Sequence, residues 1–367
     1  MRGWLSEAIR VSLARLFPGS SVSTVCRPVL CLPEHTVTLD EAVSHMGALH
    51  SGHPRIGTAQ RLMRNTSVRT RHLVDPFADV VRPRTFGERM RRYAEAGTEL
   101  GARAARGALA EAGTAPDEVD HLVLVSCTGY LLPGLDARVA GRLGLRRDVR
   151  RLAFTQVGCA GGAYALARAR ELAAVRPGSV TLIVAVELCS LSYQPGDDRI
   201  ASFVSTALFG DAAAACVVRE DRPGLRLDAS YEDLAPDTLG HISYEVDELG
   251  FHFDTNPRIS RVVAEAMPGL RRWLEDETPV LAPQPDFLVG HTGGPRIMYE
   301  VSKGLGIPPA MFELSENSLT RRGNTASVVV LDVLEQTFDD PPRAGAQGLV
   351  VAFGPGVTTV AVTGTWV

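Results

Sequence analysis

The chain has 367 residues, of which 45% are hydrophobic and 22% are charged, and its formal net charge is -4 at pH 7. This length suits one large domain or two fused ones, and the composition is that of an ordinary globular protein. A slightly acidic chain without a long apolar run is not expected to bind nucleic acid or to cross a membrane. The six cysteines are scattered without paired C-x-x-C motifs, so we expect reduced thiols in a cytoplasmic protein and no metal site.

The first part of the chain is rich in arginine. Residues 1–22 alternate short apolar runs with arginines and are interpreted as an N-terminal extension that could form a short amphipathic helix. Asp40 is the expected N-cap of a helix that runs to His50. A basic run follows, and it is either a solvated face or a clamp for phosphate groups, which guanidinium groups suit. Its cations are Arg55, Arg61, Arg64, Arg69 and Arg71.

From residue 88 onward, predicted strands and helices alternate, which is typical of a mostly parallel sheet covered by helices. A composition shift near residue 222 separates two parts, 23–222 and 223–367, whose similar order of elements suggests an ancient duplication. Helices are predicted over 88–112, 160–174, 259–274, 295–305 and 323–338, strands over 121–126, 180–186, 212–218, 225–231, 285–291, 348–353 and 358–362, and polar loops over 187–199 and 232–248.

Cys159 lies between a predicted strand and a predicted helix, in the sequence Thr155-Gln-Val-Gly-Cys-Ala-Gly-Gly-Ala-Tyr164. Backbone N–H groups and the helix dipole stabilise an anion at such a turn, which lowers the pKa of a thiol and favours the nucleophilic thiolate. The adjacent glycines let a substrate approach the backbone closely. A lone cysteine in this setting is more often a buried structural residue.

Two further polar residues lie at the ends of predicted elements. His291 ends a strand and Asn324 precedes a helix, and both are flanked by glycines. Taken singly, such a histidine is commonly a surface residue and such an asparagine is commonly an N-cap. Together with Cys159 they form a coherent set, because a Cys–His pair gives an activated thiolate and His and Asn side chains can both donate to an oxyanion.

The motifs around these residues resemble, in order and in spacing, those of the type III polyketide synthases, the chalcone-synthase-like enzymes of the thiolase superfamily. The resemblance runs from about Cys26 to Trp366, and in its details the chain is similar to the bacterial tetrahydroxynaphthalene and germicidin synthases. The resemblance implies an α/β, five-layered αβαβα fold built from two pseudo-repeated halves, and a homodimer. The motifs are Gly158-Cys-Ala-Gly-Gly162, Phe209-Gly-Asp211, Gly250-Phe-His-Phe253, His291-Thr-Gly-Gly-Pro295, Arg322-Gly-Asn324 and Gly354-Pro-Gly-Val-Thr358.

The resemblance implies a decarboxylative Claisen condensation. Cys159 would take a starter acyl group from coenzyme A, and His291 would form an ion pair with the thiolate. His291 and Asn324 would stabilise the enolate that malonyl-CoA forms when it loses carbon dioxide, and this enolate would attack the thioester on Cys159. Because decarboxylation itself generates the carbanion, no metal and no cofactor beyond the coenzyme A thioester substrates is implied.

The resemblance also implies positions for the substrate cavity and the coenzyme A tunnel. Phe209 and Phe251 match two gatekeeper phenylalanines, for which core packing is the alternative, and Leu132 matches a residue that reaches into the cavity of the partner subunit. Cavity positions fall on Cys127, Thr128, Cys189, Ser192 and Ala326, and coenzyme A positions on Arg61, Gly293 and Gly294, with Arg55 or Arg64 in place of the lysines of plant relatives.

The predicted function is therefore a type III polyketide synthase that extends an acyl-CoA starter with malonyl-CoA to an aromatic or pyrone product, for which we favour one like 1,3,6,8-tetrahydroxynaphthalene. Ser192 and Leu132 depart from the residues common in naphthalene-forming relatives, so the product is not carried over from the family. Two alternatives remain open: an initiating ketoacyl-carrier-protein synthase with the same Cys-His-Asn set, and a non-catalytic acyl-binding subunit. The Gly354-Pro-Gly356 ending and the intact catalytic set favour the polyketide synthase.

Overall fold

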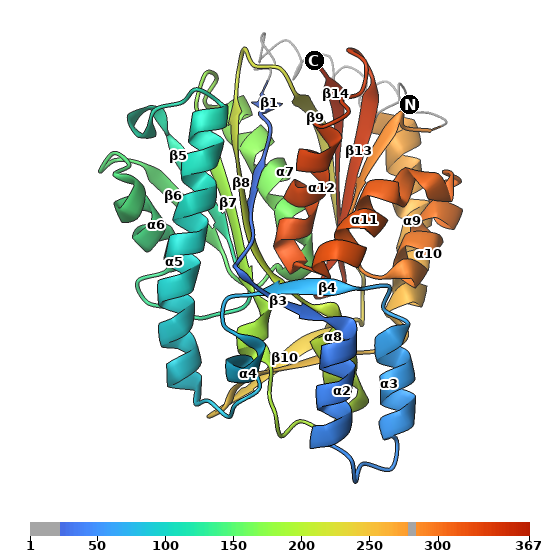
Figure 1. The fold of residues 1–367 in the computed structure, drawn as a ribbon. Helices are drawn as coiled ribbons and strands as arrows, with labels where there is room; N and C mark the ends of the chain where they lie inside the picture. Colours follow the sequence, from blue (N-terminus) through green and yellow to red (C-terminus); the bar gives the residue numbers. More distant parts are fainter. Residues whose placement is uncertain (1–22, 278–283) are drawn as a thin grey trace.

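The computed structural model describes residues 23–277 and 284–367, so the predicted N-terminal extension lies outside the described residues. One mixed sheet runs through this part of the chain, with the strand order β12-β13-β14-β9-β1-β8-β7-β5-β6 and with β2 paired to β8 (Figure 1). Its strands are β1 (Thr24–Val25), β2 (Val29–Cys31), β5 (His121–Val125), β6 (Arg150–Phe154), β7 (Thr181–Leu188), β8 (Asp211–Arg219), β9 (Leu225–Leu234), β12 (Phe287–Gly290), β13 (Gln347–Gly354) and β14 (Thr358–Trp366).

The strand pairing repeats between the two parts of the chain. β5 pairs in parallel with β6 and β7, and β7 then pairs antiparallel with β8. In the second part, β12 is parallel to β13, which is antiparallel to β14. The short strand β1 lies between β8 and β9, antiparallel to both, and so joins the two patterns into one sheet.

Helices divide the molecule into five layers. α7 (Gly161–Val175) and α12 (Val329–Thr337) form the central layer, and α5 (Phe86–Glu111) with α6 (Leu135–Leu143) covers the outer face of β5, β7 and β8. α9 (Ile259–Glu277), α10 (Pro295–Leu305) and α11 (Glu313–Arg322) cover the outer side of β12 to β14 (Figure 1). The α/β architecture in five layers that the sequence predicted is confirmed.

The apolar run of β5 shows why the central strands have no polar face. Val123 and Val125 point into the central layer, whereas Leu122 and Leu124 point toward α5 and α6. Alternate residues of a strand lie on opposite faces, so a strand between two helical layers must be apolar at every position.

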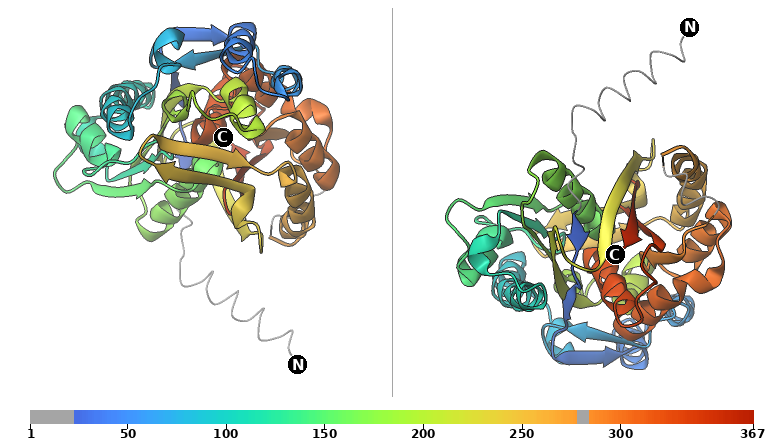
Figure 2. Two further views of the ribbon diagram at one scale, coloured as in Figure 1. Left: turned by 90° about the horizontal axis from the view of Figure 1, so that it is seen from below. Right: turned by 90° about the horizontal axis from the view of Figure 1, so that it is seen from above.

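A smaller group of elements lies across the edge where the parallel strands end (Figures 1 and 2). It includes an antiparallel pair of strands, a hairpin and several helices, and the hairpin forms a two-stranded sheet separate from the main one. The elements are β3 (His35–Thr38), α2 (Leu39–Leu49), α3 (Ile56–Arg64), β4 (Thr70–Leu73), α4 (Phe77–Val80), α8 (Ile200–Leu208), β10 (Ile242–Asp247) and β11 (Gly250–Thr255). These elements enclose the space beyond the strand ends.

Several predicted boundaries are wrong for local reasons. α2 begins at Leu39 because Thr38, not Asp40, is its N-cap: the Thr38 hydroxyl accepts from the Glu41 N–H at 3.2 Å, and the Glu41 carboxylate accepts from the Thr38 N–H at 2.7 Å. β7 extends to Leu188, into the predicted polar loop over 187–199. The predicted loop over 232–248 contains the end of β9 and all of β10. Strand β10 pairs with β11 to form the hairpin, and it does not join the main sheet. The predicted helix over 323–338 begins as a 3₁₀ turn, Ala326–Val328, before α12.

Helix α7 approaches the turn before α12 so closely that position 162, in the first turn of α7, must be glycine. A Cβ at position 162 would lie 2.5 Å from the carbonyl oxygen of Ser327 and 3.0 Å from the Cβ of Val330. No rotation of a side chain relieves a contact with a backbone oxygen, so the two helices would have to separate.

We expect Gly162→Ala to destabilise the protein by about 1–3 kcal/mol, because overpacking at this contact forces the backbone to shift. The urea midpoint of unfolding measures the change. Gly141→Ala is the matched control, since a Cβ at this α6 position meets nothing within 4 Å and should leave the midpoint unchanged or raise it. Equal midpoints for both variants would contradict the packing argument.

Candidate active site

The nucleophile turn follows β6. Gly158–Ala160 forms a single 3₁₀ turn that leads into α7, with Cys159 at its centre. Gly158 has φ = 55°, and a Cβ there would lie 2.4 Å from Cδ of Pro355, in the loop between β13 and β14. Only glycine combines this left-handed conformation with so close an approach, so the turn holds Cys159 at the start of α7.

The structure brings His291 and Asn324 to the same place as Cys159. His291 directly follows β12 and is 5% exposed, and Asn324 follows α11 and is 3% exposed. The Asn324 backbone pairs with Phe209 in an isolated bridge, which ties the second part of the chain to the first. The Asn324 side-chain oxygen accepts from the Ala326 N–H at 2.9 Å, so the amide N–H₂ is the end left to face the site. Ala326 reaches this position with φ = 49°, an uncommon conformation for a residue with a Cβ.

Burial acts against both charged forms of the catalytic pair. It raises the pKa of Cys159 to about 12, with a further contribution from the nearby Glu187 carboxylate, and it lowers the pKa of His291 to about 4. The sequence prediction that the helix start lowers the pKa of this thiol is therefore wrong, because desolvation raises the pKa by more than the helix start lowers it. Asn324 opposes burial at both residues: it lowers the pKa of Cys159 and raises that of His291. Since opposite charges attract strongly where water is scarce, we expect a thiolate on Cys159 and an imidazolium on His291 to stabilise each other.

Neither ring nitrogen of His291 has a hydrogen-bond partner of good geometry among the described residues. A buried imidazole without a fixed partner can accept the thiol proton or donate to a substrate oxygen. This is the arrangement that activation of a cysteine by a neighbouring base requires.

Cys159 lines a cavity of about 570 Å³, a volume within the usual range for a small-molecule site. Its lining is mostly apolar and aromatic, and much of it comes from the β10–β11 hairpin. The predicted residues Cys127, Cys189, Phe209, Phe251 and Ala326 all line it. The other principal lining residues are Phe86, Gly129, Tyr130, Ile242, Tyr244, Val246, Phe253 and Pro355.

The two predicted gate residues, Phe209 and Phe251, pack on different aromatic partners. The ring of Phe209 packs edge-to-face on Phe253, with 5.1 Å between ring centroids. Phe251 instead packs on Phe86 at 5.5 Å, and Tyr244 contacts both hairpin phenylalanines at 5.2 and 5.6 Å. Phe253 was not predicted as a site residue, although the alternation of Phe251, His252 and Phe253 on a strand places both phenyl rings on one face.

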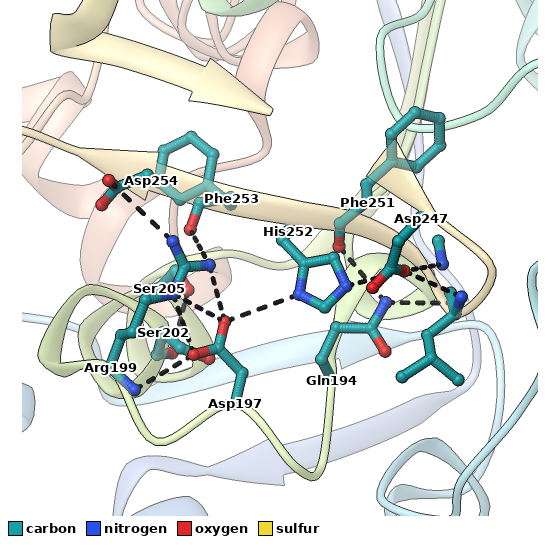
Figure 3. Close-up of polar contacts among 12 residues, drawn as sticks. Gln194, Asp197, Arg199, Ser202, Ser205, Asp247, Phe251, His252, Phe253 and Asp254 are labelled. Carbon is teal, nitrogen blue, oxygen red and sulfur yellow. Dashed lines mark hydrogen bonds and ion pairs between the residues drawn. The ribbon is translucent and has the colours of Figure 1, made fainter. Parts of the chain in front are cut away.

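Polar contacts fix the hairpin that carries these rings (Figure 3). The Gln194 amide nitrogen donates to the backbone oxygens of Leu249 at 3.2 Å and Phe251 at 3.3 Å. His252, on the opposite face of β11 from the phenyl rings, has Nε2 2.9 Å from the Asp247 carboxylate and Nδ1 3.9 Å from that of Asp197. Arg199 binds Asp197 through two nitrogens and also donates to the Phe253 carbonyl oxygen at 3.5 Å. The tip and one edge of the hairpin are therefore held to the segment before α8.

Glu187 is a site residue that the sequence analysis missed. It lies in β7, is fully buried, and accepts from the Cys127 N–H at 3.1 Å and from the Thr128 hydroxyl at 3.0 Å. The hydroxyl of Ser327, three residues after Asn324, donates to the other carboxylate oxygen of Glu187. Burial raises the pKa of Glu187 to about 7, and these hydrogen bonds oppose the shift, so the group can hold or release a proton near neutral pH. The sequence feature that could have indicated this residue is a single acidic side chain, Glu187, directly after the apolar run 180–186.

Three of the predicted cavity residues do not line this cavity. Thr128 is fully buried, and its hydroxyl is turned to Glu187. Ser192 lines a separate, smaller chamber. Leu132 is 90% exposed on the loop before α6, so within one subunit it has no cavity to fill.

The predicted coenzyme A residues lie at the surface. Arg55, Arg61 and Arg64 are exposed at the start and along the length of α3, where Arg64 pairs with Asp40 at 2.5 Å. Gly293 and Gly294 precede α10, and Gly294 is its N-cap with φ = 111°. Among the described residues, no group of three or more His, Cys, Asp and Glu side chains is arranged to hold a metal ion. Within the same residues, no helix has the length and apolar character needed to cross a bilayer.

The chain was compared with known protein families. The N-terminal domain of the chalcone and stilbene synthases matches residues 37–222, and the C-terminal domain of the same enzymes matches residues 226–364. These two matches account for most of the described structure.

Individual relatives match over nearly the whole chain. A 1,3,6,8-tetrahydroxynaphthalene synthase from Streptomyces griseus is 42% identical over 348 residues, which are 94% of this chain and 93% of that protein. The crystal structure of a 1,3,6,8-tetrahydroxynaphthalene synthase from Streptomyces coelicolor superposes with a TM-score of 0.91 at 37% identity, covering 94% of this chain and 99% of that one. Germicidin synthase from Streptomyces coelicolor superposes with a TM-score of 0.89 at 30% identity, covering 95% and 100%.

We expect His291→Gln to move the alkylation of Cys159 by iodoacetamide to higher pH. The variant lacks the imidazole that could accept the thiol proton, while burial and the Glu187 carboxylate still raise the pKa of Cys159, so the labelling rate at pH 7 should fall more than tenfold and should still be rising above pH 9. The pH profile of the labelling rate, read by peptide mass spectrometry, makes the comparison. Identical profiles for the variant and the unmodified protein would show that the two groups do not titrate as a pair.

Proposed function

The chain belongs to the chalcone and stilbene synthase family, the type III polyketide synthases, and from this we propose that it condenses malonyl-CoA into an aromatic polyketide like 1,3,6,8-tetrahydroxynaphthalene. It is an acyltransferase of this family. The observation that carries the product proposal is the 42% identity, over 94% of the chain, to a synthase of that compound. A naphthalene skeleton corresponds to five two-carbon units, so malonyl-CoA would supply the starter as well as the extender units.

In the proposed priming step, His291 takes the proton of the Cys159 thiol while the sulfur attacks the thioester carbonyl of the starter. The carbon–sulfur bond to coenzyme A breaks, and the coenzyme A thiolate leaves with the proton from His291. Asn324 supports this step because it favours the charged form of both partners. The starter acyl group then remains as a thioester on Cys159.

In the proposed extension step, malonyl-CoA loses carbon dioxide, and the electron pair of the broken bond becomes an enolate. The Asn324 amide and the ring N–H of His291 donate to the enolate oxygen, in a site where little water competes. The enolate carbon attacks the thioester carbonyl on Cys159, and the sulfur of Cys159 leaves. The longer chain on coenzyme A can reload onto Cys159 and repeat the cycle before it cyclises.

The coenzyme A arm is proposed to enter between α3 and the start of α10. Arg55, Arg61 and Arg64 provide guanidinium groups for phosphates, and the positive end of the helix dipole of α10, which begins after Gly294, provides a second attraction. The aromatic rings of Phe209, Phe251 and Phe253 are proposed to separate this entrance from the cavity. With reduced cysteines, the enzyme is proposed to act in the cytoplasm.

No observation favours the two alternatives that the sequence left open. Both parts of the chain match the chalcone and stilbene synthases, which argues against a carrier-protein synthase. The intact set of a half-buried Cys159 with the buried His291 and Asn324 argues against a subunit without catalysis.

We also propose that the enzyme is a homodimer. β6 is an edge strand of the main sheet with largely exposed side chains, and such an edge favours pairing with another strand. Leu132 is 90% exposed close to Tyr130, which lines the cavity and is itself 65% exposed. A second copy on this side would bury both residues and would complete the cavity wall.

We expect the pure protein to convert malonyl-CoA alone into a tetrahydroxynaphthalene-like product with release of carbon dioxide, as measured by mass spectrometry. Cys159→Ala should lower product formation at least about a thousandfold, because no thioester can form. Cys31→Ala is the matched control and should stay active. Carbon dioxide release with only short products would disprove the proposed product and leave the condensing activity; no reaction with any acyl-CoA starter would disprove the function.

We expect Leu132→Lys to weaken the dimer at least tenfold in Kd, equivalent to about 1.4 kcal/mol, because a charge would replace a buried apolar contact. Light scattering after size-exclusion chromatography at several concentrations gives the mass. Tyr299→Lys, at an exposed aromatic position on α10, is the control and should leave the dimer intact. A monomeric unmodified protein would end the dimer proposal.

A further inference from the structure

A second chamber adjoins the catalytic cavity. Its volume is about 60 Å³, and it shares Cys189, Phe209, Tyr244 and Phe253 with the cavity as a common wall. The far wall is polar and includes Gln194, Asp197, Ser202, Ser205 and His252, all drawn in Figure 3. The catalytic steps described above use none of these polar groups.

Arg71, on β4, lines this chamber and is only 2% exposed. One of its terminal nitrogens donates to the carbonyl oxygen of Thr206. Its Nε and its other terminal nitrogen have no hydrogen-bond partner among the described residues, and within those residues Arg71 forms no ion pair. The Ser192 hydroxyl, in the same chamber, also lacks a partner there.

Asp211 is the carboxyl group whose charge acts on Arg71, and its oxygens already accept hydrogen bonds from other residues. Asp211 accepts from the Ser190 N–H at 2.7 Å, the Ser190 hydroxyl at 2.5 Å and the Val74 N–H at 2.9 Å. Asp197, in the far wall, is bound by Arg199 at 2.7 Å. Neither carboxylate is therefore free to pair with the Arg71 guanidinium.

A buried cation with unmade hydrogen bonds is costly, so native proteins seldom keep one without a partner. Burial lowers the pKa of Arg71 to about 10, which still leaves it protonated at neutral pH. The unmet donors of Arg71 and Ser192 therefore call for oxygen acceptors, and a negatively charged group would satisfy both the charge and the hydrogen bonds.

The size of the chamber limits what can enter. At about 60 Å³, against about 570 Å³ for the catalytic cavity, the chamber suits a small group such as a carboxylate. The planar fork of a guanidinium matches a carboxylate with two parallel hydrogen bonds. The ligand must also reach the chamber from Cys159, past the wall of Cys189, Phe209, Tyr244 and Phe253.

We propose that this chamber is a subsite for the distal carboxylate of a malonyl-derived starter carried on Cys159, held by Arg71 and Ser192. The inference rests on the proposed function, because it concerns which starter that reaction accepts. A neutral starter of the same length leaves the guanidinium unpaired, whereas a malonyl starter satisfies it. Arg71 thus selects the starter and takes no part in the bond changes at Cys159.

The test is a competition in one mixture between two starters of equal length. Malonyl-CoA serves as extender and as charged starter, and acetoacetyl-CoA, with a methyl ketone in place of the carboxylate, serves as neutral starter. With malonyl-CoA labelled uniformly with 13C and acetoacetyl-CoA unlabelled, mass spectrometry gives the ratio of malonyl-primed to acetoacetyl-primed products, because an acetoacetyl starter contributes its own unlabelled carbons. This ratio does not depend on how much of a variant is correctly folded, so a general loss of structure cannot imitate a change in selectivity.

We expect Arg71→Lys to lower this ratio at least tenfold, because an ammonium group cannot form the paired hydrogen bonds, and Ser192→Ala to lower it about threefold. Arg69→Lys, an exposed arginine two residues away, is the matched control and should leave the ratio unchanged. If Arg71→Lys yields no product, the Ser192→Ala ratio decides.

An unchanged ratio with a lower total rate would overturn the subsite and assign Arg71 a structural role. An unmodified enzyme that extends acetoacetyl-CoA but never starts from malonyl-CoA would overturn the subsite while leaving the polyketide synthase function in place. An unmodified enzyme that extends neither starter would instead refute the proposed function itself.

Discussion

Cys159 lies beside His291 and Asn324, which are almost fully buried, and this burial governs the protonation of the groups around it. Burial alone would keep the thiol and the imidazole neutral. Asn324 opposes this effect at both residues, and we expect a thiolate and an imidazolium to stabilise each other further. Burial likewise leaves Glu187 with a pKa near 7 and makes an unpaired Arg71 conspicuous. Polar groups in such a site interact strongly because little solvent screens their charges.

The three proposed catalytic residues come from different parts of the chain, and the sheet brings them together. Cys159 follows β6 and His291 follows β12, at the edge where the parallel strands end, while Asn324 reaches the site through its bridge to Phe209. Tight contacts at Gly158 and Gly162 then remove the remaining freedom of the nucleophile turn. The geometry of the site is therefore set by backbone packing in the centre of the molecule, not by the flexible surface.

From the sequence, the layers could be predicted and Cys159, His291 and Asn324 could be named as a candidate set, because both depend on local signals: apolar strands, glycine-rich turns and motif spacing. The sequence analysis missed residues whose role arises from long-range packing. Glu187 looked like the first residue of a polar loop, and β10 looked like a loop because the hairpin has one polar face. Phe253 is recognised as the neighbour of Phe209 only once β11 is placed against α8. Arg71 was one arginine among several until its burial separated it from the exposed ones.

The β10–β11 hairpin shares no strand pairing with the main sheet, yet it supplies much of the cavity wall. A substitution on its inner face alters the volume offered to a growing chain without disturbing the register of the strands that position the nucleophile. Selection can therefore act on the shape of the product and on the bond-forming steps almost independently. An ancestral enzyme with this layout could diversify its metabolites through a few changes in one small ribbon, while inheriting its reactive centre intact.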